Sequence, residues 1–284
     1  MKAKYYISLS LVSIIICLGL SILGGYPGHH IKFLVVSIVY AGLTYFLLSK
    51  AIIKKERTLT VLILFIPPFL IYIPLEIVDY SALALPSTLA YFIGMGFGIL
   101  IYVSKIYLKV LLSILLITAS VWMAFIGYTL WLHNINFGTF TGKVNYKVTC
   151  QIEGENQFGY HISNQDLIDK YIVIDFWNTH CGVCFHEFPE FQKLYNSYKN
   201  ESNIAFLAIN KPLKMDTLGQ AFQMIKQRNY TFTTLVPVDE QLPEKLGIEY
   251  YPTIIIIDRQ GMAIFRGSVE RAGSVIQGII KNGM

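Results

Sequence analysis

The sequence YIVIDFWNTHCGVC, residues 171–184, places two cysteines directly after a stretch that has the composition of a buried β-strand. Residues 171–177 are apolar except for Asp175 and are rich in β-branched and aromatic side chains, which is typical of a strand covered on both faces. From Cys181 to Tyr198, large apolar residues recur mostly every three or four positions, which predicts an amphipathic helix. The cysteines therefore fall where a strand gives way to a helix.

A cysteine at the amino end of a helix is placed for thiol chemistry. The unpaired backbone N–H groups and the partial positive charge at that end stabilise a thiolate. Two residues separate Cys181 from Cys184, which suits a small disulfide ring across the first helical turn. We interpret Cys181 as the nucleophile that attacks a client disulfide, and Cys184 as the thiol that resolves the mixed disulfide.

A Cys-x-x-Cys pair is also half of many zinc sites, so that alternative has to be weighed. A structural zinc site normally needs a second pair of ligands. The same half of the chain offers four further Cys or His residues without the usual pair spacing, namely Cys150, His161, His180 and His186. The sequence therefore predicts no metal, and no cofactor other than a redox-active disulfide between Cys181 and Cys184.

The remainder of residues 146–284 alternates between short apolar runs and amphipathic stretches. Strands are predicted at 146–152, 158–162, 171–177, 204–209, 233–237, 253–258 and 263–266, and helices at 181–198, 217–228 and 268–281. This alternation predicts an α/β domain with a central mixed sheet flanked by helices.

The first half of the chain has a different composition. Residues 1–138 hold nine Lys or Arg and three Asp or Glu, a net charge of +6, whereas residues 139–284 have a net charge of −1. A membrane span needs about 20 mostly apolar residues. Five uncharged runs of suitable length predict a transmembrane helical region over 1–133, with spans at 5–23, 33–49, 59–75, 85–104 and 110–132. Residues 134–145 are interpreted as a linker.

The charged residues between these runs predict the topology. Basic residues gather before span one and on alternate connections, at Lys2, Lys4, Lys50, Lys54, Lys55, Arg57, Lys105 and Lys109. The opposite connections hold Lys32, Glu76 and Asp79. Because basic loops favour the cytoplasm, we expect a cytoplasmic amino terminus and a carboxyl-terminal domain on the other side of the membrane. The partner of these basic residues is then the lipid bilayer, and no nucleic acid is expected.

The segment DFWNTHCGVCFHEFP, residues 175–189, resembles the active-site region of the TlpA/ResA-like branch of thioredoxin-fold thiol–disulfide oxidoreductases. The resemblance covers about residues 146–284 and implies a thioredoxin fold that works outside the cytoplasm. It also implies that Glu187 tunes the active-site thiols, that Asp175 accepts a proton from the resolving thiol, and that Pro189 is the proline that kinks the helix.

A second segment, GIEYYPTIIIID at 247–258, resembles the family segment that carries a cis-proline, here Pro252. The resemblance implies that Tyr251 and Pro252 border the cysteines and offer backbone groups to an extended substrate peptide. Trp177 and His180, which lie close to Cys181 in the sequence, are further candidates for substrate binding.

These observations predict a membrane-anchored oxidoreductase that reduces protein disulfides outside a bacterial plasma membrane. Its partners would be disulfide-bearing client proteins and an electron donor or acceptor, with a membrane-bound protein among the candidates. His180 and Val183 depart from the family pattern, and the residues around the pair set the redox potential. A disulfide-forming oxidase or isomerase with the same residues is therefore an alternative, and so is a non-catalytic membrane module that binds peptides.

Overall fold

The computed structural model describes residues 2–51, 54–78 and 82–283, so the predicted outer-loop residue Asp79 lies outside the described residues. The chain divides into two compact units between residues 135 and 136. This division falls inside the stretch interpreted as a linker, although the preceding helix continues to Phe137 and the first strand begins at Lys143.

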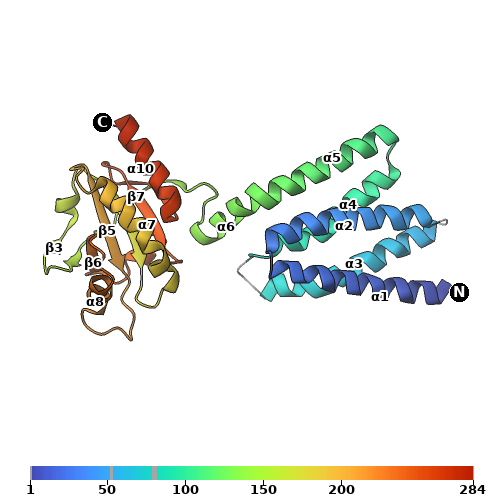
Figure 1. Ribbon diagram of the computed structural model, residues 1–284, viewed down its shortest axis with the longest axis horizontal. Coiled ribbons are helices and arrows are strands. Elements are labelled where there is room, and N and C mark those ends of the chain that lie inside the picture. Colours follow the sequence, from blue (N-terminus) through green and yellow to red (C-terminus); the bar gives the residue numbers. More distant parts are fainter. Residues whose placement is uncertain (1, 52–53, 79–81, 284) are drawn as a thin grey trace. The chain divides into compact units, whose positions relative to one another are not determined.

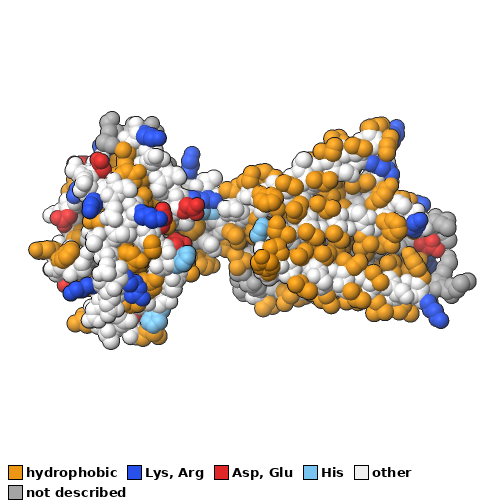
Figure 2. Space-filling view, in the orientation of Figure 1, with side chains coloured by type: hydrophobic (Ala, Val, Ile, Leu, Met, Phe, Trp, Pro, Cys, Tyr) orange, Lys and Arg blue, Asp and Glu red, His pale blue; other side chains and the backbone are white. Residues whose placement is uncertain are grey.

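The first unit is helical, as predicted. Its elements are α1 Lys2–Ser21, η1 Ile22–Gly24, α2 His29–Lys50, α3 Lys54–Val78, α4 Leu85–Val103, α5 Ile106–Trp122, the π-helical turn η2 Met123–Gly127, and α6 Tyr128–Phe137 (Figure 1). In the described part of the chain, five helical stretches are long and apolar enough to cross a membrane, and the last of them runs unbroken from Ile106 to Phe137. Figure 2 shows hydrophobic side chains over these helices, with Lys and Arg gathered at the end where α1 begins.

Helices α2 and α4 approach each other closely because α4 presents glycines at the contact. A Cβ atom added to Gly94 would lie 2.5 Å from the carbonyl oxygen of Ser37, and one added to Gly98 would lie 2.6 Å from that of Ala41. Small residues allow membrane helices to pack backbone against backbone. The two glycines therefore fix the distance between α2 and α4.

The second unit contains the mixed sheet predicted from the sequence. Its strands are β1 Lys143–Lys147, β2 Gly154–Asn156, β3 His161–Ile162, β4 Tyr171–Trp177, β5 Ile204–Asn210, β6 Thr234–Pro237, β7 Thr253–Ile257 and β8 Met262–Gly267. They lie in the order β1-β8-β7-β4-β5-β6-β2-β3, with β4, β5 and β6 parallel and the other pairs antiparallel. The helical elements are η3 Asn164–Leu167, α7 Gly182–Tyr198, α8 Gln220–Gln227, α9 Leu242–Lys245 and α10 Val269–Gly283.

Strand β4 occupies the middle of the sheet and is buried on both faces. Val173 and Trp177 pack in one hydrophobic cluster, together with side chains of α7 and α10, which lie side by side (Figure 1). Ile174 and Phe176 pack in the cluster on the opposite face. Since parallel strands end at the same edge, the ends of β4 and β5 together form the platform from which the cysteine loop leaves the sheet.

Some predictions of secondary structure in the second unit are wrong. Strand β2 was not predicted, and the predicted strand 158–162 is reduced to His161–Ile162 because residues 157–159 form the turn between β2 and β3. The predicted strand 146–152 is shifted, because the chain pairs with β8 only over Lys143–Lys147 and forms no strand from 148 to 153. The short helices η3 and α9 were missed, since each is about one turn long and shows no helical period of its own.

Candidate active site

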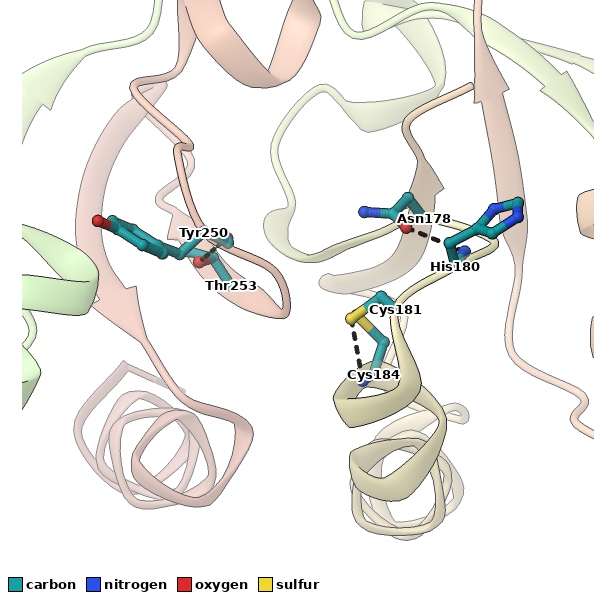
Figure 3. The surroundings of a disulfide bond; sticks show 6 residues. All are labelled: Asn178, His180, Cys181, Cys184, Tyr250 and Thr253. Carbon is teal, nitrogen blue, oxygen red and sulfur yellow. Dashed lines mark hydrogen bonds between the residues drawn. A yellow bond between two sulfur atoms is a disulfide. The ribbon is translucent and has the colours of Figure 1, made fainter. Parts of the chain in front are cut away.

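Cys181 and Cys184 are joined by a disulfide at the amino end of α7 (Figure 3). Cys181 has an extended backbone conformation and caps the helix, where its sulfur accepts a hydrogen bond of 3.1 Å from the backbone N–H of Cys184. The side chain of Cys181 is partly exposed, whereas that of Cys184 is fully buried. An incoming sulfur can therefore reach Cys181 but not Cys184.

Two carboxyl groups lie on the strand and the helix that flank the cysteine loop. Asp175, in the middle of β4, is only 2 % exposed, and its Oδ1 atom has no hydrogen-bond partner among the described residues. Burial, and to a lesser degree the charge of Glu187, raises the pKa of Asp175 well above its usual range. Glu187 is half-buried on α7, and its pKa is raised first by burial and further by Glu270, against a lowering effect of His186. Asp175 therefore retains its proton to higher pH than an ordinary aspartate.

The predicted cis-proline is confirmed, because the bond between Tyr251 and Pro252 is cis. In the sheet register Thr253 pairs with Phe176, so Pro252 lies beside the end of β4, from which the cysteine loop departs. Tyr251 is half-buried and packs against both hydrophobic clusters, and burial raises its pKa to about 12. Its phenol is therefore neutral at physiological pH.

The structure does not support the predicted substrate contact for Trp177. Its side chain is fully buried and packs edge-on against Phe185 and Phe188 in the first turns of α7. This position leaves no surface for a client peptide. Trp177 instead connects the end of β4 to the helix that carries the cysteines.

His180 is exposed and belongs to a polar cluster that the sequence did not reveal. Its Nδ1 atom lies 3.0 Å from the hydroxyl oxygen of Thr179, and that hydroxyl donates a hydrogen bond of 2.5 Å to the carboxylate of Asp216. The Asp216 carboxylate also accepts from the backbone N–H of Leu213. These bonds tie the loop after β5 to the cysteine loop, and in Figure 3 the ring of His180 points away from the disulfide.

Tyr250 is another residue that the sequence analysis missed. It is 47 % exposed, and its carbonyl oxygen accepts a hydrogen bond from the Thr253 hydroxyl. Figure 3 shows this segment across from the disulfide, on the side opposite His180. No pattern in the sequence distinguished Tyr250 from Tyr251.

Comparison with known proteins shows which proteins the second unit resembles. Residues 145–264 match the AhpC/TSA family model. The ResA thiol-disulfide oxidoreductase of Halalkalibacterium halodurans is 29% identical over 118 residues, which cover 42% of this chain and 61% of that protein. The chain contains an AhpC/TSA thioredoxin-fold domain, homologous to ResA proteins.

Two further proteins are similar to part of the chain. The ResA protein of Bacillus subtilis is 24% identical over 110 residues, covering 39% of this chain and 59% of that protein. The solved thioredoxin domain of a Bacteroides vulgatus thiol-disulfide oxidoreductase is 19% identical, covers 48% of this chain and 98% of that chain, and has a TM-score of 0.43. The chain thus spans about three-fifths of the length of these ResA relatives, and the helices before residue 138 lie outside the AhpC/TSA match.

The other two cysteines lie outside this disulfide. Cys17 is buried among the helices of the first unit, and Cys150 is half-buried in a cleft with Asp239 and Lys245. Burial raises the pKa of Cys150, which disfavours its thiolate. In the described ranges 2–51, 54–78 and 82–283, no group of three or more His, Cys, Asp or Glu side chains is arranged to hold a metal ion.

Proposed function

We propose that this protein is a membrane-anchored thiol–disulfide oxidoreductase that reduces client disulfides outside the plasma membrane of a bacterium. The observation that carries the proposal is the placement of the two sulfurs: Cys181 is partly exposed at a helix amino end, and Cys184 is buried one turn deeper. Homology of the AhpC/TSA domain to proteins named thiol-disulfide oxidoreductases supports the same chemistry.

The reaction begins from the reduced dithiol form. The thiolate of Cys181, stabilised by the amino end of α7, attacks one sulfur of the client disulfide and expels the other as a thiolate. The ionised form of Asp175 is the proposed acceptor of the Cys184 proton, and the Cys184 thiolate then attacks the Cys181 sulfur and expels the client sulfur as a second thiolate. The client leaves as a dithiol after taking up two protons, and the two electrons it gains come from the oxidation of the cysteine pair to a disulfide.

Glu187, Tyr251 and Pro252 complete the proposed site. Glu187 adds negative charge near Asp175 and so raises the pKa of that carboxyl, which makes its ionised form a stronger proton acceptor. Tyr251 and Pro252 offer backbone groups to an extended client segment next to Cys181, and His180 forms part of the surrounding surface.

The oxidised pair needs an electron donor before it can react again. The helical unit contains a single cysteine, Cys17, and relay by disulfide exchange requires a cysteine pair. The helical unit therefore lacks the cysteine pair that such a relay needs, and the proposed donor is a membrane-bound dithiol protein. The charge pattern of the helix connections supports a cytoplasmic amino terminus and an extracytoplasmic AhpC/TSA domain.

Trapping experiments test the proposal directly. The Cys184→Ser variant should accumulate mixed disulfides between Cys181 and clients, whereas Cys181→Ser should form none and should lose turnover. If Cys181→Ser retains the biological role, the chain acts as a non-catalytic peptide-binding module instead.

The reduction potential of the pair decides the direction of the reaction. A value near that of thioredoxin, about −270 mV, supports a reductase. A value near that of DsbA, about −120 mV, assigns the protein to the disulfide-forming oxidases.

A further inference from the structure

A groove of about 520 Å³ runs along the helical unit between α2, α4 and α5. Its walls include isoleucines from all three helices, such as Ile38, Ile101 and Ile117. Gly42 of α2 also lines it, and a Cβ atom added to Gly42 would meet no atom within 4 Å. The groove is therefore open at Gly42, in contrast to the tight contact at Gly94.

One charged side chain lines this apolar groove. The sequence analysis placed Lys109 on the connection before span five, but α5 begins at Ile106, so Lys109 belongs to the helix. Its ammonium nitrogen lies 5.1 Å from the ring centre of Tyr45, which lines the groove from α2. Among the described lining residues there is no Asp or Glu, so the charge of Lys109 is not neutralised within the groove.

Lys109 lies at the basic end of the helical unit. Helix α2 ends there at Lys50, and Lys105 caps the amino end of α5. The guanidinium of Arg57 lies 5.3 Å from the ring centre of Tyr102 at the end of α4. Figure 2 shows Lys and Arg side chains gathered at this end. The groove therefore combines apolar walls along its length with positive charge at one end.

We infer that this groove binds an anionic phospholipid, with an acyl chain along the apolar walls and the phosphate at Lys109. A lysine near the end of a membrane helix extends its ammonium group to the headgroup region while its methylene stem stays in apolar surroundings. A headgroup with net negative charge pairs with that ammonium, whereas a zwitterionic headgroup brings its own compensating cation. The inference rests on the proposed membrane anchoring.

Native mass spectrometry of the full chain tests the inference. The purified protein in detergent is mixed with equal amounts of phosphatidylglycerol and phosphatidylcholine, and the bound lipids are counted. The wild type should retain phosphatidylglycerol in preference. Lys109→Gln should lower the ratio of phosphatidylglycerol to phosphatidylcholine about fivefold, the effect of one lysine near an anionic lipid surface. Gly42→Leu should fill the groove and reduce the retention of both lipids.

Two matched controls separate a specific site from general effects. Gly96→Leu adds the same side chain at another position with open space, on a residue that does not line the groove, and should retain lipid like the wild type. Lys50→Gln removes a charge at the same end of the unit but outside the groove lining, and should preserve the lipid ratio.

Three results would overturn the inference: an unchanged ratio in Lys109→Gln, an equal fall in Lys50→Gln, or full retention in Gly42→Leu. The ratio of bound phosphatidylglycerol to phosphatidylcholine in Lys109→Gln tests the inference even if Gly42→Leu proves unstable. Lys109→Gln should fold, because glutamine replaces only the charged end of a half-exposed side chain. Recovery of the chain in the membrane fraction and its disulfide-exchange rate are measured separately. An unchanged lipid ratio in Lys109→Gln, with both of these at wild-type level, contradicts the lipid site and leaves the proposed anchoring and activity standing.

Discussion

Replacing Asp175 with asparagine should make the AhpC/TSA domain more stable at neutral pH. The carboxyl of Asp175 is 2 % exposed, and its Oδ1 atom has no hydrogen-bond partner in the described part of the chain. Ionising such a group in the folded protein is costly, which is why burial raises its pKa. Asparagine keeps the shape of the side chain and removes the ionisation.

The sign and size of the effect follow from proton linkage. At a pH below the ordinary aspartate pKa of about 3.9, Asp175 is protonated in both the folded and the unfolded chain and has no pH-dependent effect. Above that pH the unfolded chain loses the proton while the folded chain keeps it. One retained proton lowers the free energy of unfolding by about 1.4 kcal/mol per pH unit, until the pH passes the raised folded-state pKa. The advantage of Asp175→Asn should therefore grow with pH from about 4 upward.

Urea unfolding of the full chain in mild detergent, at intervals from pH 4 to pH 8, measures the difference in free energy of unfolding between Asp175→Asn and the wild type. Trp177 reports on the domain when Trp122 and Trp131 are replaced by phenylalanine, because the sequence contains only these three tryptophans. Burying the asparagine amide can carry a cost that does not depend on pH. Such a cost shifts the difference in unfolding free energy equally at every pH and leaves its slope against pH unchanged. A difference that stays flat from pH 4 to pH 8, or that favours the wild type increasingly as the pH rises, refutes the reasoning.

Three further substitutions test separate parts of the structure. Gly98→Val should destabilise the helical unit by about 1–3 kcal/mol through overpacking against α2, whereas the control Gly96→Val should be tolerated. Thermal unfolding in detergent measures both variants, and equal melting temperatures would contradict the close packing of α2 and α4. Thr179→Val removes the hydroxyl that donates to Asp216 and should cost about 1.5–3 kcal/mol, with Thr179→Ser restoring most of it; a neutral valine variant would rule out a stabilising tether. Trp177→Ala should lower the free energy of unfolding by about 3–5 kcal/mol, because its side chain is fully buried. The milder Trp177→Phe should leave the KM for a disulfide peptide unchanged. A raised KM would show that Trp177 contacts the substrate after all.

The cysteine site could be predicted from the sequence because its determinants are local. The apolar strand, the helical period and the spacing of Cys181 and Cys184 all lie within one short segment, and together they place both sulfurs at a helix amino end. Resemblance to a family then supplied Pro252, which lies beside that segment only because β7 pairs with β4.

Other parts of the site depend on tertiary structure and could not be predicted. Asp216 is 37 residues away from Thr179 and contacts it only because β4 and β5 are parallel neighbours. The burial of Trp177 could not be predicted from the sequence either, since a tryptophan next to a cysteine loop can face either solvent or the core. Trp177 faces the core because it continues the alternation of Val173 and Asp175 along β4.

The complete burial of Cys184 has a consequence for how the enzyme behaves among small thiols. A soluble thiol such as glutathione can form an adduct only at Cys181, and the neighbouring sulfur is then positioned to expel it within the same molecule. A capped enzyme would thus free itself without a second protein, at a rate independent of protein concentration. A mixed disulfide at Cys181 would persist only where the inner sulfur is missing, as in Cys184→Ser.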